Sequence, residues 1–360
     1  MAPVEADRRW TQLGDLLVNY SARVKPGERV IIAMGEVESF PLVQAVYAAV
    51  IRAGSFPQVQ FLSETLRHAL LADGSAQQLA WVPEIEAYAM QWADVYFGLR
   101  GAFDLNIHQD ISADRLSLNQ AAAGKISTLR WQNTRWCLVR VPNQVFARQA
   151  GVDMDKILDM FFNACLLDWE AMTQKWSLWA SRLNQARQVR LVGKDTDLTF
   201  ATEGRTWLVG DGRNNMPDGE INTAPVESTI DGCIYFEFPG VLSGRLMQDI
   251  RLRWEHGHLV EATSSTNQDF LRSILSSDAG ASLIGEFAVG TNPFINLFCK
   301  DILIDEKIGG TVHIAMGRAY PQCGGTNQSA IHWDIIKDTR REGAVYVDNQ
   351  LVFHNGQFLF

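Results

Sequence analysis

The sequence lacks the features that mark membrane, secreted and nucleic-acid-binding proteins. No apolar run reaches the roughly 18 residues that a transmembrane helix needs, and the opening segment MAPVEADRRW has no apolar stretch of a secretory signal. The net charge is −9, and lysines and arginines form no cluster, which argues against nucleic acid as a partner. We therefore expect a cytoplasmic protein that binds neither membranes nor nucleic acid.

Two kinds of binding motif are also missing. The five cysteines are scattered singly and form no Cys-x-x-Cys pair, which argues for reduced thiols and against a thiolate zinc site. A glycine-rich phosphate fingerprint is absent after the first predicted strand, where residues 34–39 carry one glycine and two acids. We therefore expect no dinucleotide site.

The first half of the chain shows short apolar segments that alternate with helical patterns. With 360 residues, 47% of them hydrophobic, the chain is long enough for two domains with a sizeable core. Apolar segments that alternate with helices indicate βαβ units and a mainly parallel sheet. The predicted strands are 29–34, 57–62, 94–99 and 136–141, and the predicted helices are 6–24, 41–52 and a long stretch over 154–188.

The second half of the chain has a different pattern. Short alternating segments separated by turns predict a β-rich α+β domain. These segments are 189–193, 196–201, 206–210, 232–238, 247–254 and 258–263, with one helix at 265–276. We therefore predict an α/β N-terminal domain over residues 1–188 and a β-rich C-terminal domain over residues 189–360.

A His-Trp-Asp step near the end of the chain indicates metal chemistry. Side chains two apart in a strand point the same way, so His332 and Asp334 should project together, with Trp333 on the other face. The segment 311–316 also reads as a strand, and it carries His313. Imidazole nitrogens and carboxylate oxygens suit a divalent transition metal, so we interpret this region as half of a metal site.

Isolated acids elsewhere are candidates for the other half. Glu306 lies just before a Gly-Gly pair, and Glu220 and Glu286 each lie singly in the segments NMPDGE and GEFAVGTNP. Each acid alone would be a solvated loop residue, but beside the histidines it becomes a candidate carboxylate ligand. We interpret Asp305 and Lys307 as structural neighbours or an ion pair.

Taken in order, these motifs resemble the M29 family of metallo-aminopeptidases. The similarity is dense over residues 190–360, and it is looser through VKPGERVII and TDLTF. The motifs that carry it are NMPDGE, TAPVE, GEFAVGTNP, DEKIGGTVHIA, RAYP and GGTNQSAIHWD. The resemblance implies an α/β domain followed by a β-rich metal domain, a homodimer, and short peptides as substrates.

The resemblance also implies the site residues. The family's metal-binding positions fall on Glu220, Glu286, Glu306, His313, His332 and Asp334. Six ligands, four of them acidic, suit two divalent cations, with zinc, cobalt and manganese all compatible. The expected reaction is removal of N-terminal residues by a hydroxide held between the two metals. In it, Glu286 bridges the metals as a catalytic carboxylate, and Tyr320 donates a hydrogen bond to the oxyanion.

Two other functions are compatible with part of the pattern. His313, His332 and Asp334 alone would satisfy the mononuclear iron site of a ring-cleaving dioxygenase, and some proteins that share this fold resemble such enzymes. A mononuclear site has no use for the three glutamates, so hydrolysis is favoured. A non-catalytic, metal-stabilised binding protein would instead need a closed and saturated ligand set.

Overall fold

The computed structural model describes residues 7–359, which form two compact units. Unit 1 comprises the residues up to Leu166 together with Gly212–Pro217, and unit 2 comprises Leu167–Asp211 and the chain from Asp218 onward. The predicted boundary after residue 188 differs from this division. Helix α9 (Trp169–Leu183) belongs to unit 2 because it packs beside strand β7 (Leu208–Val209) of that unit.

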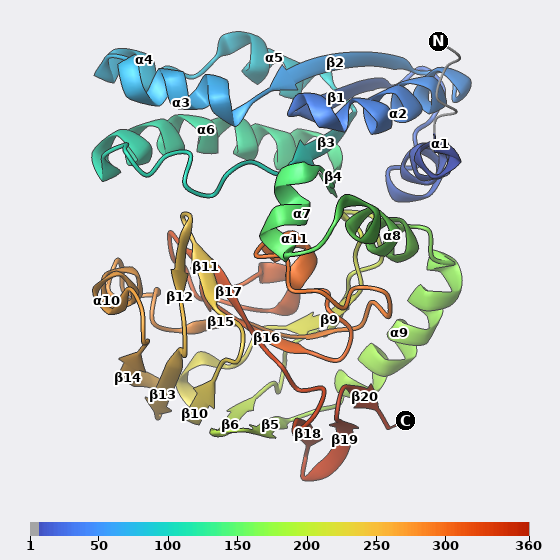
Figure 1. The fold of residues 1–360 in the computed structure, drawn as a ribbon. Coiled ribbons are helices and arrows are strands. Elements are labelled where there is room, and N and C mark those ends of the chain that lie inside the picture. Colours follow the sequence, from blue (N-terminus) through green and yellow to red (C-terminus); the bar gives the residue numbers. More distant parts are fainter. Residues whose placement is uncertain (1–6, 360) are drawn as a thin grey trace. The chain divides into compact units, whose positions relative to one another are not determined.

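Unit 1 is built on a five-stranded parallel sheet with strand order β2-β1-β3-β4-β8 (Figure 1). Its strands are β1 (Arg29–Gly35), β2 (Phe56–Leu62), β3 (Val95–Gly101), β4 (Arg135–Val141) and β8 (Asn215–Met216). Its helices are α1 (Arg8–Leu16), α2 (Phe40–Arg52), α3 (Glu64–Asp73), α4 (Ala76–Leu79), α5 (Glu84–Trp92), α6 (Ala113–Asn133), α7 (Gln144–Ala150) and α8 (Met154–Cys165). The predicted α/β class of the first half is confirmed.

Two predicted helices have different boundaries in the structure. The helix expected over 6–24 begins at Arg8, because Asp7 accepts a hydrogen bond from the Arg9 backbone N–H, and it ends in a π-helical turn at Leu17–Ser21. Residue 6 lies outside the described residues. The single stretch expected over 154–188 is two helices, α8 and α9. Asp168 separates them, since its side chain accepts from the Ala171 N–H and starts α9.

Unit 2 is built on two antiparallel sheets, with eight strands in the order β14-β13-β10-β6-β5-β18-β19-β20 and five in the order β17-β16-β15-β9-β7. The larger sheet consists of β5 (Gln188–Gly193), β6 (Thr196–Ala201), β10 (Asp231–Tyr235), β13 (Arg251–Glu255), β14 (His258–Thr263), β18 (Ala344–Val347), β19 (Gln350–His354) and β20 (Gln357–Phe358). The smaller one contains β7, β9 (Glu220–Thr223), β15 (Ile284–Gly290), β16 (Val312–Gly317) and β17 (His332–Lys337). The unit also contains a hairpin, β11 (Gly240–Leu242) and β12 (Arg245–Met247), and helices α9, α10 (Gln268–Leu275) and α11 (Ile302–Asp305). The predicted β-rich α+β class is confirmed.

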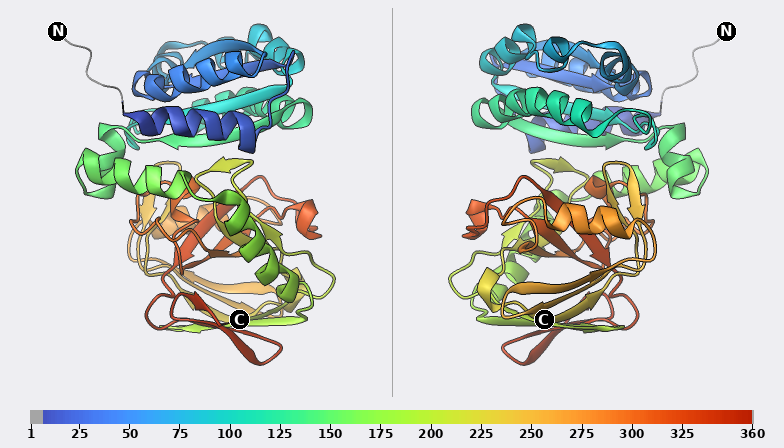
Figure 2. Two further views of the ribbon diagram at one scale, coloured as in Figure 1. Left: turned by 90° about the vertical axis from the view of Figure 1, so that its right-hand side faces the viewer. Right: turned by 90° about the vertical axis from the view of Figure 1, so that its left-hand side faces the viewer.

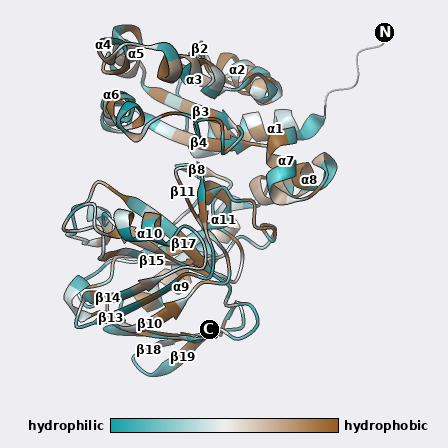
Figure 3. Ribbon diagram, turned by 60° about the vertical axis from the view of Figure 1, so that its left-hand side comes forward, coloured by the Kyte–Doolittle hydropathy of each residue, from teal (hydrophilic) through white to brown (hydrophobic). Residues whose placement is uncertain are grey.

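One face of the five-stranded sheet forms the core of unit 2. Phe287 of β15 contacts Phe200 of β6 with ring centroids 5.0 Å apart, so the two sheets pack on each other (Figure 2). Figure 3 shows hydrophobic residues on both the strands and the helices that pack against them. The opposite face of the five-stranded sheet is left for polar side chains. Among the described residues, no helix is both long and apolar enough to cross a membrane.

Candidate metal centre

Strand register brings the candidate ligands onto one face of the five-stranded sheet. Ala315 of β16 lies opposite both Glu286 of β15 and Asp334 of β17. His332 lies two residues before Asp334, and His313 lies two before Ala315, so these side chains project from the same face. Trp333, the residue between His332 and Asp334, is buried, as the alternation requires.

Small residues fill the other positions of that face. Ala315 separates two candidate ligands, and Ala288 lies opposite His313 on one side and Asn222 on the other. Gly290 lies opposite Glu220. Because alanine and glycine reach little beyond the backbone, they leave room above the sheet among the longer acidic and imidazole side chains.

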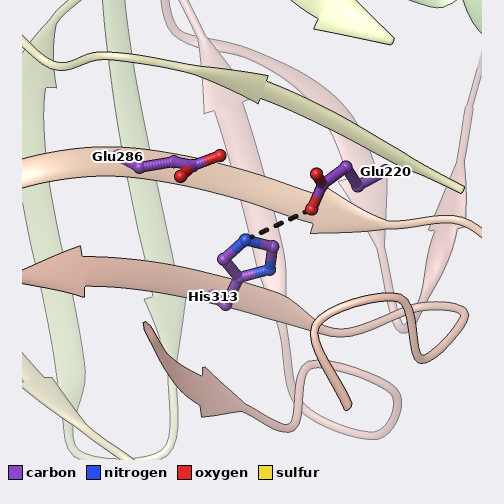
Figure 4. Close-up of side chains that lie close together, drawn as sticks. All are labelled: Glu220, Glu286 and His313. Carbon is purple, nitrogen blue, oxygen red and sulfur yellow. Dashed lines mark ion pairs between the residues drawn. The ribbon is translucent and has the colours of Figure 1, made fainter. Parts of the chain in front are cut away.

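The six residues predicted as ligands come together in three overlapping groups. In each group the potential ligand atoms lie within 4.8 Å of one another. The groups are Glu220, Glu286 and His313; Glu286, His332 and Asp334; and Glu306, His313 and Asp334. Figure 4 shows the first group, whose side chains approach one another from three adjacent strands. Each pair of groups shares one residue, so the cluster is continuous.

Two glycines allow the acids outside the central strands to reach this face. Gly219 has φ +117°, and a Cβ there would lie 3.0 Å from Trp176 and 3.1 Å from Asn292, so only glycine turns the chain into β9 without strain. A Cβ on Gly290 would lie 3.0 Å from the Glu306 carbonyl oxygen. The lack of a side chain at residue 290 thus lets the Glu306 segment approach β15.

His332 is held in one orientation, with its Nε2 toward the acids. Its Nδ1 lies 2.7 Å from the Arg318 carbonyl oxygen, which can only accept, so Nδ1 carries the proton. Its Nε2 lies 3.2 Å from Glu286 Oε2 and 3.6 Å from Asp334 Oδ1. Burial would lower the pKa of His332, but Asp334 and Glu286 outweigh it and raise the pKa to about 10.

Several buried polar atoms of the cluster have no hydrogen-bond partner among the described residues. They are Glu220 Oε2, Asp334 Oδ1 and both ring nitrogens of His313. Leaving such an atom unpaired costs about 1–3 kcal/mol, so the arrangement is unfavourable unless a further group binds. Four carboxylates and two imidazoles are a donor set that fits divalent cations such as zinc, cobalt and manganese.

Lys307 is a member of the cluster that the sequence did not identify as a site residue. Its side chain is fully buried, and its Nζ lies 3.0 Å from Glu220 Oε1, 3.7 Å from Asp218 Oδ1 and within hydrogen-bonding distance of Glu306 Oε1. Burial would lower the pKa of Lys307, but these acids raise it well above its usual value. In the sequence, the only feature that points to Lys307 as a site residue is its place directly after Glu306. Asp305 is structural, since it accepts from the N–H groups of Cys299 and Asp301.

Asn222 and Tyr320 complete the surroundings of Glu286. Asn222 Nδ2 donates to Glu286 Oε1 at 2.6 Å. Burial would raise the pKa of Glu286, but His332, His313 and Asn222 outweigh it and lower that pKa. The Tyr320 ring lies 4.8 Å from the His332 ring, and loss of water together with the nearby carboxylates raises the Tyr320 pKa, which keeps the phenol protonated.

The fold and this cluster agree with the comparison to known protein families. Residues 6–358 match the family described as thermophilic metalloprotease (M29), so the protein is a metallopeptidase. Within that class, the chain belongs to the M29 family. The predicted family and the predicted class of enzyme, a metal-dependent peptide hydrolase, are confirmed.

Named relatives match most of the chain at low identity. Aminopeptidase T of Thermus thermophilus is 26% identical over 353 residues, covering 88% of this chain and 86% of its own length. Aminopeptidase 2 of Geobacillus stearothermophilus is 21% identical over 356 residues, covering 88% and 84%. Both matches extend over the two predicted domains.

Two solved structures have a similar fold. Wild-type AmpT from Thermus thermophilus superposes with a TM-score of 0.87 at 23% identity, covering 98% of this chain and 99% of that one. The 2,5-dihydroxypyridine dioxygenase of Pseudomonas putida superposes with a TM-score of 0.60 at 16% identity, covering 97% and 96%. At these identities the likeness concerns the fold alone.

Proposed function

We propose that this protein is a metal-dependent aminopeptidase that removes N-terminal residues from short peptides and holds two divalent cations. The proposed ligands are Glu220, Glu286, Glu306, His313, His332 and Asp334. The observation that carries the proposal is their gathering into three overlapping groups around buried, unpartnered ligand atoms. The aminopeptidase names of the relatives in Thermus and Geobacillus support the same activity.

When bound, two such cations make hydroxide available at neutral pH and polarise the scissile carbonyl. Glu286, like His313 and Asp334, belongs to two of the three groups, and it would be the carboxylate shared by the two cations, as the resemblance to the family implies. Asn222 fixes Glu286 through Oε1, and the Arg318 carbonyl fixes the His332 ring. Lys307 holds Oε1 of Glu220, and Oε2, which has no hydrogen bond and lies 3.5 Å from His313 Nε2, would face a cation (Figure 4).

The remaining steps belong to the chain's own acids and phenol. A carboxylate of the cluster accepts a proton from the attacking water and passes it to the leaving amine. Tyr320 stays a protonated donor, and its hydroxyl stabilises the oxyanion that forms at the scissile carbonyl. The free amino group of the peptide binds an acid or a cation of the cluster, which restricts cleavage to the N-terminal residue.

The geometry favours hydrolysis over the iron dioxygenase reaction. A mononuclear site would gather His313, His332 and Asp334 around one ion. Among residues 7–359, each of the three groups includes at least one of Glu220, Glu286 and Glu306. No group therefore consists of the two histidines and the aspartate alone. The glutamates are therefore part of the cluster and not neighbours of a two-histidine, one-aspartate site.

Metal content and product analysis test this proposal together. Protein stripped of metal and refilled with zinc, cobalt or manganese should hold about two ions per chain in this cluster and release free amino acid from short peptides. An N-acetylated peptide of the same sequence serves as the control, and it should not be cleaved. Glu286→Gln should abolish turnover and lower metal content while the circular dichroism spectrum is preserved. A requirement for Fe(II) and dioxygen would establish the dioxygenase reaction instead.

The quaternary structure is a separate part of the proposal. We propose a homodimer, as the resemblance to the family implies, and a cytoplasmic location, as the scattered cysteines with no Cys-x-x-Cys pair indicate. Light scattering on the purified protein should give a mass near twice the 40.3 kDa of the chain. A monomer that is fully active would contradict the dimer without affecting the proposed chemistry.

A further inference from the structure

A second cluster of imidazoles and acids lies in unit 1, at the carboxyl ends of the parallel strands. Strand β1 lies between β2 and β3. The chain therefore forms β2 on one side of β1 and later forms β3 on the other side. In open parallel sheets, ligands bind beyond the carboxyl ends where the strand order reverses in this way. The segments that leave those ends run into α3 and toward α6 (Figure 1).

Two histidines face each other at this position. His68 lies on α3, and His108 lies in the segment between β3 and α6. Their Nδ1 atoms are 3.4 Å apart, and the two rings are inclined by only 15°. Each Nε2 faces a carboxylate: that of His108 lies 2.9 Å from Glu64 Oε2, and that of His68 lies 3.6 Å from Asp110 Oδ2.

The surrounding contacts hold the cluster in place. Glu36 follows β1 and accepts a hydrogen bond from the Glu64 N–H at 2.7 Å, which fixes the start of α3. Arg67 contacts Glu64 at 3.1 Å and donates to Asn119 of α6 at 3.0 Å. The cluster is thus attached to α3 and α6, and the His68 side chain remains 29% exposed, which gives a ligand access from solvent.

The carboxylates determine what the two facing nitrogens can bind. An ionised carboxylate only accepts hydrogen bonds, so the His108 Nε2, 2.9 Å from Glu64, carries a proton toward it, whereas the His68 Nε2, 3.6 Å from Asp110, lies beyond hydrogen-bond distance of its acid. A neutral His108 ring then presents a lone pair at Nδ1, and a His68 ring with its proton on Nε2 presents a second lone pair 3.4 Å away. Two nitrogens bound to one zinc ion at about 2.0–2.1 Å and a tetrahedral angle would lie roughly 3.3–3.4 Å apart. A carboxylate on the other ring nitrogen is the usual companion of a metal-binding histidine.

We propose that His68 and His108 bind one divalent transition-metal ion through their Nδ1 atoms, separately from the metal centre of unit 2. Glu64 accepts the Nε2 proton of His108 and orients that ring, and Asp110 lies on the Nε2 side of His68. Water or a small oxygen ligand completes the coordination. The proposal does not depend on peptidase activity, because none of these residues belongs to the cluster of unit 2.

The metal content of full-length variants tests the site. Wild type and the double variant His68→Ala/His108→Ala are stripped of metal, loaded with zinc, desalted and analysed by mass spectrometry. The double variant should hold one zinc fewer per chain and keep its peptide hydrolysis rate. His256→Ala, which removes a histidine whose side chain is 92% exposed, is the matched control and should lose none. Equal zinc in wild type and double variant, or an equal loss in the control, would overturn the proposal.

Nitrogen NMR of the histidine side chains tests the unmodified protein. Zinc should shift the Nδ1 resonances of both residues while each Nε2 stays protonated. The competing explanation is a single proton shared between the two rings. In that case zinc would leave both Nδ1 resonances unchanged, and the metal site would be excluded.

Discussion

The Lys307 ammonium lies 3.0 Å from Glu220 Oε1 in a fully buried position, next to two further acids. It is the cation that the structure itself supplies to a strongly acidic cluster. We expect Lys307→Met, which keeps the length and removes the charge, to leave Glu220, Glu306 and Asp218 without this compensation. The metal-free protein should lose about 3–5 kcal/mol of stability, and the zinc-loaded protein should lose less. Thermal unfolding with chelator and with zinc measures the difference.

Lys125→Met, on the exposed surface of α6, is the control for that experiment and should change neither midpoint appreciably. An equal loss of stability with and without zinc would mean that Lys307 contributes packing only. Its ammonium would then have no part in balancing the acids.

Ala315 tests whether the cluster needs open space above the sheet. It lies opposite both Glu286 and Asp334, so Ala315→Leu should place a branched side chain between these acids without changing any charge. We expect metal content to fall by at least one ion per chain and the metal-free protein to lose about 1–3 kcal/mol from overpacking. Ala344→Leu, in the partly exposed β18, controls for the added volume. Full metal content in Ala315→Leu would contradict the proposed cation positions.

Tyr320 tests the proposed oxyanion contact. Tyr320→Phe removes the hydroxyl and keeps the ring that packs against His332. We expect kcat to fall about 10²–10³-fold, as for loss of one oxyanion donor, with KM and metal content unchanged. Tyr346→Phe, in the eight-stranded sheet, should behave as wild type. A higher KM with an unchanged kcat would assign Tyr320 to substrate binding instead.

Metal removal should destabilise unit 2 locally. Cations that bind only the folded state stabilise it by about 2.7 kcal/mol at a free concentration 100 times Kd. Hydrogen exchange should therefore accelerate on chelation in β9, β15, β16 and β17, which carry five of the six candidate ligands. The amides of β4 in unit 1 serve as the internal reference. Uniform acceleration across both units would indicate general destabilisation and not loss of a bound ion.

The sequence predicted those parts of the fold that depend on local pattern. Apolar segments bounded by turns located β1 to β4 within one or two residues of their ends. The alternation of side chains in a strand also placed His332 and Asp334 on the same face. The break between α8 and α9 was missed, because aromatic residues run through both helices and only the cap at Asp168 separates them.

Features that depend on distant segments could not be predicted from local pattern. Lys307 has no motif of its own, and two of its acids, Asp218 and Glu220, lie far away in the sequence. The pairing of His68 with His108 has no counterpart in the sequence, since nothing in either segment shows that α3 and the chain before α6 meet. The bond from Asn222 to Glu286 likewise exists only once β9 pairs with β15.

Strand β8 determines how this protein can be divided into expression fragments. The chain leaves unit 2 after Asp211, pairs with Leu138 and Val139 of β4, and returns at Asp218. An expression fragment that stops at residue 166 or 188 would uncover that edge of β4 and invite strand addition from another copy. Neither unit corresponds to one continuous stretch of coding sequence, so isolating unit 2 requires excising residues 212–217 and rejoining the ends.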